Sequence, residues 1–327
     1  MLKLVHPAME SKSGEPMNQS TYSEELPAEV LDDVASVVGA EVTLLSRLPG
    51  GNGGVMRVQL AGRANAVLKA VPRAHPAARA SARPLIDWGL PVPNHLDETL
   101  RTQRVVEHMR RRGYPTPAWL GVGATPTHVW HLMDFVDAAP VPKLTPSLVE
   151  QLMEIIELQA GEASEPYDHW SHAWRVAAGP KSAVAGLSGY SSVVSALVER
   201  LRLVCADVPP TREAPDMVHA DLSIGNVLVR DGAVVAVVDL GNAGSGTRAT
   251  DLTTLVWYTF QDPQLDDVRR RLWTRSLDLV GWEGAAVLAA AQILHMLDVH
   301  IRQGRHDVVP EAVKRGHRTL DELNALR

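Results

Sequence analysis

The chain has 327 residues and a mass of 35.5 kDa, which is enough for two lobes that each bury their own hydrophobic core. Its 45% hydrophobic and 21% charged residues are typical of a globular protein. The net charge of −6 argues against nucleic-acid binding, which normally requires a concentrated basic surface, and is consistent with a cationic small-molecule partner.

The N-terminal residues do not have the pattern expected of a signal peptide. Residues 1–24 lack the apolar core of a signal peptide, and no apolar run is long enough to cross a bilayer. We therefore expect a mobile tail over residues 1–24, a cytoplasmic protein and no membrane partner. The single cysteine, Cys205, cannot form an internal disulfide, and its apolar neighbours predict a buried thiol.

The first elements predict a small β-rich region. Helical spacing of apolar residues covers Glu25–Val38, and strands are expected over Glu41–Leu48 and Val55–Leu60. A glycine-dense turn separates these strands, and such a backbone can approach phosphate oxygens closely. In isolation this pattern is more typical of a plain flexible hairpin. The turn contains Gly51, Asn52, Gly53 and Gly54.

Lys69 lies in the middle of the strand-like run Ala66–Val71. A buried ammonium is costly without a partner, so this position suggests a function, although a lysine on a solvent-facing edge strand is the alternative. A helix is expected over Glu98–Arg112 and a strand over His128–Val136. The prolines that follow Asp137 mark the boundary between two lobes.

The second half of the chain is predicted to be mainly helical. Thr145 is a suitable N-cap for the helix that extends to Ala160. Residues 161–174 are expected to be irregular, and residues 241–246 to be a flexible linker. Asp168, His169 and His172 invite comparison with a metal site, but polar caps in a loop explain them better without a third ligand. Further helices are expected over residues 191–204, 252–260, 265–280, 284–302 and 310–326.

The stretch Val218–Asp239 is the most informative part of the sequence about function. Two apolar runs joined by Asp231-Gly232 predict a β-hairpin with a type I′ turn. The hairpin folds the chain back and brings Asp221, Asn226 and Asp239 together at one end. Two carboxylates and an amide suit Mg²⁺, which prefers oxygen ligands and often shares substrate phosphates.

This stretch resembles the catalytic segment of the aminoglycoside phosphotransferase family, relatives of the protein kinases. The HxDxxxxN motif matches His219, Asp221 and Asn226, and the metal-binding acid after the hairpin matches Asp239. The resemblance implies that Asp221, with His219, forms the catalytic loop and orients the attacking hydroxyl. It also implies that Asn226 and Asp239 hold Mg²⁺ against the phosphates of ATP or GTP.

The same resemblance implies an α+β, bilobal protein-kinase-like fold. A nucleotide-binding lobe would span residues 25–137, and a mainly helical catalytic and substrate-binding lobe residues 138–327. Lys69 would reach the nucleotide phosphates, the glycine-rich turn would cover them, and the backbone around the hinge would meet the adenine. That hinge comprises Asp134, Phe135 and Val136.

The sequence departs from the family at two places. Thr102 stands where a glutamate usually orients the lysine, so Glu98, one turn earlier, is the candidate partner of Lys69. Ala220 stands where glycine is usual. Asp251 matches a structural acid of the family, although a simple helix N-cap explains it equally well.

The resulting hypothesis is transfer of the γ-phosphoryl group of ATP or GTP to a hydroxyl of a small molecule. Resemblance favours an aminoglycoside or another cationic antibiotic such as capreomycin or viomycin, and hence antibiotic resistance. Acids of the second lobe agree with a cationic acceptor, although solvated helix faces explain them as well. These acids are Asp262, Asp266, Asp267 and Asp298.

Three rival functions stay open. One is a kinase of small metabolites such as choline, homoserine or a sugar. Another is a kinase-like nucleotide-binding protein without turnover, which the changes at Thr102 and Ala220 would support. A metal-dependent hydrolase using His219, Asp221 and Asp239 is the third, but such sites normally contain more histidine ligands.

Overall fold

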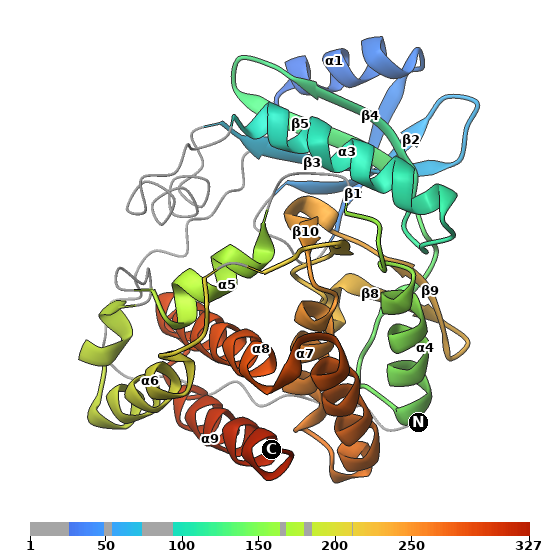
Figure 1. Ribbon diagram of the computed structural model, residues 1–327. Coiled ribbons are helices and arrows are strands. Elements are labelled where there is room, and N and C mark those ends of the chain that lie inside the picture. Colours follow the sequence, from blue (N-terminus) through green and yellow to red (C-terminus); the bar gives the residue numbers. More distant parts are fainter. Residues whose placement is uncertain (1–25, 49–53, 74–93, 164–167, 180–184, 211) are drawn as a thin grey trace, which may run out of the picture.

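The computed structural model describes residues 26–48, 54–73, 94–163, 168–179, 185–210 and 212–327. It has a β-sheet region followed by a mainly helical region, as expected for a kinase-like phosphotransferase fold (Figure 1). The predicted tail and Gly51, Asn52 and Gly53 lie outside the described residues.

The N-terminal region is built on a five-stranded antiparallel sheet with the order β1-β2-β3-β5-β4. Burial alternates along β2, so every second side chain packs into a core. Helix α1 (Ala28–Val38) covers this face, where Val30 and Val34 pack with Leu68 and Trp130. The strands are β1 (Val42–Arg47), β2 (Val55–Leu60), β3 (Asn65–Pro72), β4 (Trp119–Ala124) and β5 (His128–Asp134).

Helix α3 (His95–Arg111) lies between β3 and β4 in the chain and packs beside the sheet (Figure 1). It begins at Asn94, whose side chain accepts a hydrogen bond from Leu96 N. Its buried residues Val105 and Met109 belong to the core of the helical region, while its outer side contacts β4 and β5. Helix α3 therefore contacts both the sheet and the helical core.

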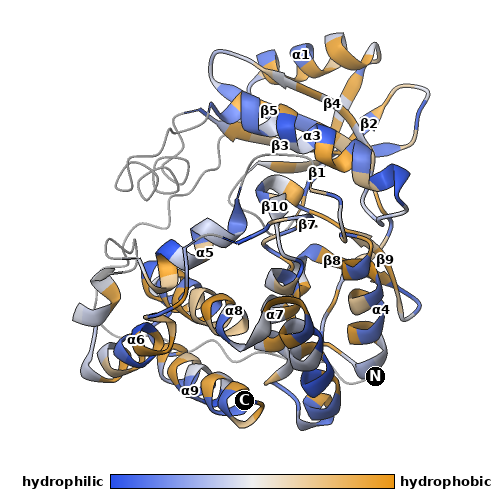
Figure 2. Ribbon diagram, in the orientation of Figure 1, coloured by the Kyte–Doolittle hydropathy of each residue, from blue (hydrophilic) through white to orange (hydrophobic). Residues whose placement is uncertain are grey.

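The helical region is organised around α8 (Asp266–Arg302), which bends at Gly281, where φ is 66° and ψ is 179°. Each of these helices carries both hydrophobic and hydrophilic residues, as Figure 2 shows for α6, α8 and α9. Their apolar side chains form one continuous core. The other helices are α4 (Pro146–Glu157), α5 (His169–Ala177), α6 (Ser192–Cys205), α7 (Ala249–Thr259) and α9 (Val309–Ala325).

Contrary to the sequence-based expectation, one apolar helix is long enough to be compared with a membrane span. The segment Pro263–Arg302 meets the criteria of length and hydropathy, and 56% of its apolar window is buried inside the protein. Residues 284–290 of α8 are all buried in the helical core. Core packing therefore accounts for the hydropathy of this helix.

Several predicted elements are confirmed. Strand β2 has the predicted bounds, Thr145 caps α4 by accepting a hydrogen bond from Leu148 N, and Cys205 is buried. Two expectations were wrong. Part of the region 161–174 forms α5 with Asp168 as its N-cap, and residues 241–246 include β10 (Gly244–Gly246) paired with β7 (Asp216–Val218).

Candidate active site

The predicted catalytic hairpin is present. Strand β8 (Val227–Arg230) pairs with β9 (Ala233–Val237), and a short strand β6 (Ala139–Pro140) lies on its other side. Asp231 and Gly232 both have positive φ, 53° and 78°, as a type I′ turn requires. The end of β9 therefore lies next to Asn226, the residue that precedes β8.

The residue before Asp239 fixes the end of the hairpin. Val238 N donates a hydrogen bond to Asn226 O at 2.8 Å, and Val238 O accepts one from His219 Nε2 at 3.0 Å. Asp239 itself has the left-handed conformation, with φ 62° and ψ 53°. Backbone hydrogen bonds thus bring the three elements of the motif together, as the spacing predicted.

His219 is fully buried, and backbone groups occupy both of its ring nitrogens. Nδ1 accepts a hydrogen bond from Asp221 N at 3.2 Å, so Nε2 must carry the proton that it donates to Val238 O. The imidazole is therefore the neutral Nε2–H tautomer. It joins the catalytic loop to the end of β9 and positions Asp221 and Asp239 relative to each other.

Asp251 has the structural role that the family resemblance suggested, rather than that of a simple N-cap. Its buried carboxylate accepts hydrogen bonds from Ala220 N at 3.0 Å and from His219 N and Gln159 Nε2, each at 2.8 Å. Ala220 adopts φ 63°, a region that costs an L-residue about 1–2 kcal/mol and favours glycine. Asp251 holds this strained turn in place.

Asp221 and Asn226 lie side by side. Asn226 Nδ2 donates to Asp221 O at 2.9 Å and to Asp221 Oδ2 at 3.2 Å. Burial raises the pKa of Asp221; the charge of the neighbouring Asp239 adds to that rise, and the hydrogen bond from Asn226 opposes it. This carboxylate is thus held in place by Asn226 and is a better proton acceptor than an ordinary aspartate.

Lys69 meets Asp239 across the two regions, 170 residues apart in sequence. Its Nζ donates to Asp239 Oδ1 at 2.7 Å. Burial alone would raise the pKa of Asp239, but the charge and hydrogen bond of Lys69 outweigh it and hold the pKa below its ordinary value. Strand β3 has partners on both sides, β2 and β5, so the alternative of an edge-strand lysine is wrong.

The lysine has no glutamate partner on α3. Thr102 is buried and donates its hydroxyl hydrogen bond to Glu98 O within the same helix. Burial raises the pKa of Glu98, which Arg101 opposes, and no contact joins Glu98 to Lys69. Within the described part of the chain, the acid that pairs with Lys69 is Asp239.

His131 lies opposite Lys69 in the β3–β5 ladder and therefore on the same face of the sheet. Its ring stacks on Trp119, with centroids 4.1 Å apart and an interplanar angle of 1°. Burial, with a smaller contribution from Lys69, lowers the pKa of His131 to about 3, so the ring is neutral at physiological pH. Sequence reasoning missed this residue because its strand periodicity alone marks it as ordinary.

The predicted hinge residues lie where the sheet meets the helical region. Asp134 ends β5, and its N donates to Ala118 O at 2.9 Å. The ring of Phe135 lies under the guanidinium of Arg57, 4.2 Å away, and Val136 O accepts a hydrogen bond from Ala138 N. The role of these residues toward a nucleotide stays a prediction.

Gly54 is the one residue of the predicted glycine-rich turn within the described ranges. Its φ is +63°, and a Cβ there would lie 2.1 Å from Ala70 O. The position therefore requires glycine because the neighbouring strand approaches so closely.

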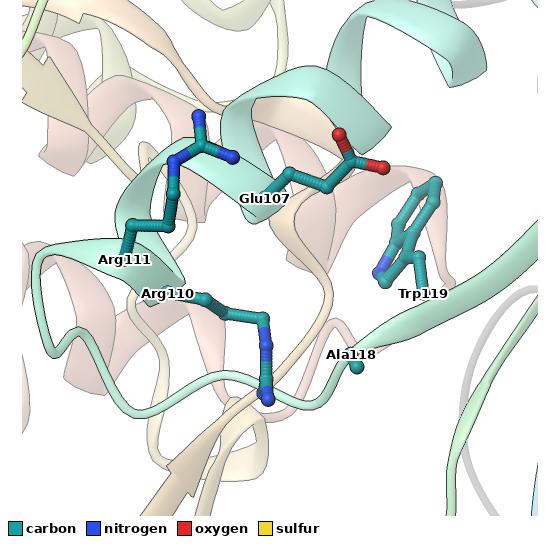
Figure 3. Close-up of a pocket in the computed structure, with 5 residues that line it drawn as sticks. All are labelled: Glu107, Arg110, Arg111, Ala118 and Trp119. Atoms are coloured by element: carbon teal, nitrogen blue, oxygen red, sulfur yellow. The ribbon is translucent and has the colours of Figure 1, made fainter.

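A separate recess of about 350 Å³ lies between the C-terminal half of α3 and the start of β4 (Figure 3). None of the proposed catalytic or metal-binding residues lines it, so it is not the place of the chemistry discussed above. Its walls are Glu107, Arg110, Arg111, Ala118 and Trp119.

The histidine-rich segment around α5 has structural roles. Asp168 caps α5 by accepting a hydrogen bond from Ser171 N, and His169 Nε2 bonds to Asn242 O at 2.7 Å. No group of three His, Cys, Asp or Glu side chains within the described ranges is arranged to hold a metal ion. The contact of His169 ties α5 to the chain just after Asp239.

The acids predicted to attract a cationic acceptor all form ion pairs with bases. The exposed fraction of the basic partner ranges from 4% for Arg269 to 68% for Arg270. These carboxylates are therefore already neutralised locally. The pairs are Asp262–Lys143, Asp266–Arg269, Asp267–Arg270 and Asp298–Arg302.

The fold and the site define a bilobal, kinase-like phosphotransferase. The model of the phosphotransferase enzyme family matches residues 90–288, more than half of the chain. The chain belongs to this family. Among curated proteins, none matches the sequence significantly.

Several solved structures share the fold at low sequence identity. Aminoglycoside phosphotransferase APH(4)-Ia superimposes with a TM-score of 0.64 at 16% identity, covering 90% of this chain and 98% of that one. A mutant of that enzyme was solved with ADP and hygromycin B. A putative fructosamine-3-kinase from Haemophilus somnus 129PT gives a TM-score of 0.54 at 13% identity, covering 89% and 96%.

The macrolide 2'-phosphotransferase MphH from Brachybacterium faecium gives a TM-score of 0.52 at 16% identity, covering 88% of this chain and 98% of that one. At these identities the likeness establishes the architecture. The acceptor of this chain must be argued from its own residues.

Proposed function

We propose that this protein transfers the γ-phosphoryl group of ATP or GTP to a hydroxyl of a small molecule, with Mg²⁺ as cofactor. The observation that carries the proposal is the meeting of Lys69 with Asp239 beside the Asp221–Asn226 pair. One ammonium, two carboxylates and an amide converge from elements far apart in sequence. This set of groups suits the binding and transfer of a phosphoryl group.

The donor set fits Mg²⁺. Asn226 uses its Nδ2 for Asp221, and its Oδ1 has no hydrogen-bond partner among the described residues; Asp239 uses Oδ1 for Lys69. Magnesium is normally held by one or two such oxygens together with substrate phosphates and water. When bound, the ion would neutralise charge on the transferring phosphoryl group.

In the proposed reaction each residue has a separate task. Lys69 neutralises phosphate charge, and its present pairing with Asp239 keeps its Nζ at the metal-binding carboxylate. Asp221, whose pKa is raised by burial, accepts or orients the proton of the attacking hydroxyl. His219 acts as a positioning residue because both its ring nitrogens hold backbone groups. Catalysis then comes from alignment and electrostatics, without a covalent intermediate.

The acceptor is proposed to be a hydroxylated small molecule. Structures of similar fold carry the names of hygromycin B, macrolide and fructosamine enzymes, which support both antibiotics and metabolites as candidates. An aminoglycoside or a peptide such as capreomycin or viomycin remains the candidate within the antibiotic class. The ion pairing of the acids of the second lobe removes one argument for a highly cationic acceptor.

The test is a product screen by mass spectrometry. The purified protein is incubated with MgATP or MgGTP and a panel of aminoglycosides, capreomycin, viomycin, macrolides, choline, homoserine and sugars. We expect one acceptor to gain the mass of one phosphate while one nucleoside diphosphate forms. Nucleotide binding with no phosphorylated product in any broad screen would favour the non-catalytic alternative.

A further inference from the structure

Side chains on α7 and α8 are electrostatic neighbours of Asp221. Helix α8 is buried almost continuously from Gly284 to Leu297, yet His295 within this stretch is exposed and interacts electrostatically with Asp221. Tyr258 on α7 forms a side-chain hydrogen bond with Ser223 of the catalytic loop and also interacts with Asp221. An acceptor that presents its hydroxyl to Asp221 must therefore lie along these side chains.

Beyond Tyr258 lies an arginine that forms no ion pair with an acid of the described residues. Arg315 on α9 bonds to Trp257 O at 3.3 Å through Nη1 and lies over the Trp257 ring, 4.9 Å from its centroid. Its Nε is buried and has no hydrogen-bond partner. Burial lowers the pKa of Arg315, and the nearby Glu311, whose closest ion-pair partner is Lys314, offsets this only in part.

A second buried nitrogen without a hydrogen-bond partner belongs to a histidine that interacts electrostatically with Arg315. His300 Nδ1 is buried without a hydrogen-bond partner, and His300 interacts with both Arg315 and Arg305. Asp307 is the acid that interacts with His300, and it forms no hydrogen bond with either arginine. Arg305 and Arg315 also interact with Tyr258, which connects them to Asp221.

By contrast, the buried guanidinium of Arg269 on the neighbouring α8 has hydrogen-bond partners that include two carboxylates. It bonds to Asp266 and Glu322 and to the carbonyl of Thr259. An arginine can therefore donate to a carbonyl near the end of α7 and still have carboxylate partners. The missing carboxylate at Arg315 is not a requirement of this helix end. Arg315 as a whole is only partly buried, but a guanidinium nitrogen that is buried without a hydrogen-bond partner is costly, and an anionic ligand that accepts from it would remove that cost.

We propose that the phosphoryl acceptor carries an anionic group, a carboxylate or a phosphate, that binds Arg315 with Arg305 and His300 while its hydroxyl faces Asp221. This rests on the proposed function because it assigns the acceptor side of the same site. Tyr258 and His295 would line the path between the anionic end and the hydroxyl. The acceptor would then be a hydroxy acid or phosphorylated polyol rather than a polycation.

The first experiment titrates the full-length protein, with MgADP bound, with inorganic phosphate and separately with acetate. The Nε–Hε NMR signal of Arg315 is assigned by its loss in Arg315→Lys. We expect this signal to shift saturably with at least one anion, and the preferred anion distinguishes phosphate from carboxylate. No saturable shift at tens of millimolar of either anion, or an equal shift of the exposed Arg318, would overturn the proposal.

The second experiment compares acceptor pairs that share a skeleton, galactose with galacturonate and glycerol with glycerate and glycerol 3-phosphate. Where turnover occurs, kcat/KM should favour the anionic member, and Arg315→Met should reduce that preference at least about tenfold, the equivalent of 1.4 kcal/mol. Lys314→Met, which removes a charge from the adjacent exposed position, should leave it unchanged. A preference that survives Arg315→Met contradicts the proposal.

The two proposals fail differently. A protein that is stabilised by MgADP but shows no anion response at Arg315 loses only the present inference. A protein that binds no nucleotide loses the phosphotransferase assignment, whatever anions do at Arg315.

Discussion

Replacing Asp251 tests how the catalytic loop is held. In Asp251→Asn, the side-chain oxygen can keep the bonds from His219 N and Gln159 Nε2, but the new amide then faces Ala220 N. One charge-assisted hydrogen bond is lost, which costs about 1.5–3 kcal/mol in the free energy of unfolding. Asp251→Ala removes both acceptor oxygens and with them all three hydrogen bonds, a large share of the roughly 5–15 kcal/mol available to a domain.

The activity effect should accompany the stability effect. Without its anchor, Ala220 relaxes from its left-handed conformation and Asp221 shifts, and a displacement of about 1 Å costs on the order of 10²-fold in kcat. The free energy of unfolding is measured by guanidinium titration, and kcat by nucleoside diphosphate release. Asp267→Asn, whose side chain is 84% exposed, is the control and should change stability by less than about 0.5 kcal/mol. Asp251→Asn with the stability of the parent would refute this reasoning.

Three further outcomes are expected. Lys69→Met should lower kcat/KM for ATP about 30–150-fold, because a charge-assisted contact contributes about 2–3 kcal/mol, whereas a drop of less than threefold in steady-state kinetics would contradict it. The pKa of Asp239 is lowered in the folded state, so its pairing with Lys69 stabilises the fold above the unfolded-state pKa of about 3.9 and is lost as pH falls through the folded value. The stability difference between the parent and Lys69→Met, from denaturant titrations, should therefore shrink below about pH 4; a difference that grows there would exclude the pair. Ala220→Gly should raise the free energy of unfolding by up to about 1 kcal/mol with kcat unchanged, while a loss of stability would show that the turn is unstrained.

Local features of the site could be predicted because their causes are local. The Asp231-Gly232 pair requires positive φ at both positions, which specifies the hairpin turn, and the hairpin in turn brings Asn226 to Asp239. Thr145 as an N-cap is equally a property of a few neighbouring residues.

Features that depend on distant contacts could not be predicted. The pairing of Lys69 with Asp239 joins two regions, whereas the sequence alone suggested Glu98 as the candidate partner of Lys69. Strand β4 was missed because glycines weaken its pattern, and β10 forms only through pairing with β7. Helix α5 was missed although Asp168 supplies an N-cap signal that could have indicated it.

The tertiary structure also decided between interpretations that the sequence alone could not separate. Asp251 suits an N-cap and a loop anchor alike until the catalytic loop is seen folded against the start of α7. His131 and Arg315 carry no motif at all. Their significance comes from what lies opposite them, which is a lysine proposed to bind nucleotide phosphates in the case of His131 and no carboxylate of the described residues in the case of Arg315.

The most direct measurement of the central claim is phosphate transfer by the parent protein and by Asp221→Ala, followed by acceptor mass. The parent should add one phosphate to a hydroxylated acceptor with one equivalent of nucleoside diphosphate, and the variant should lose about 10²–10⁴-fold in kcat while still binding MgADP. A variant that turns over at nearly the parental rate would contradict the assignment of Asp221.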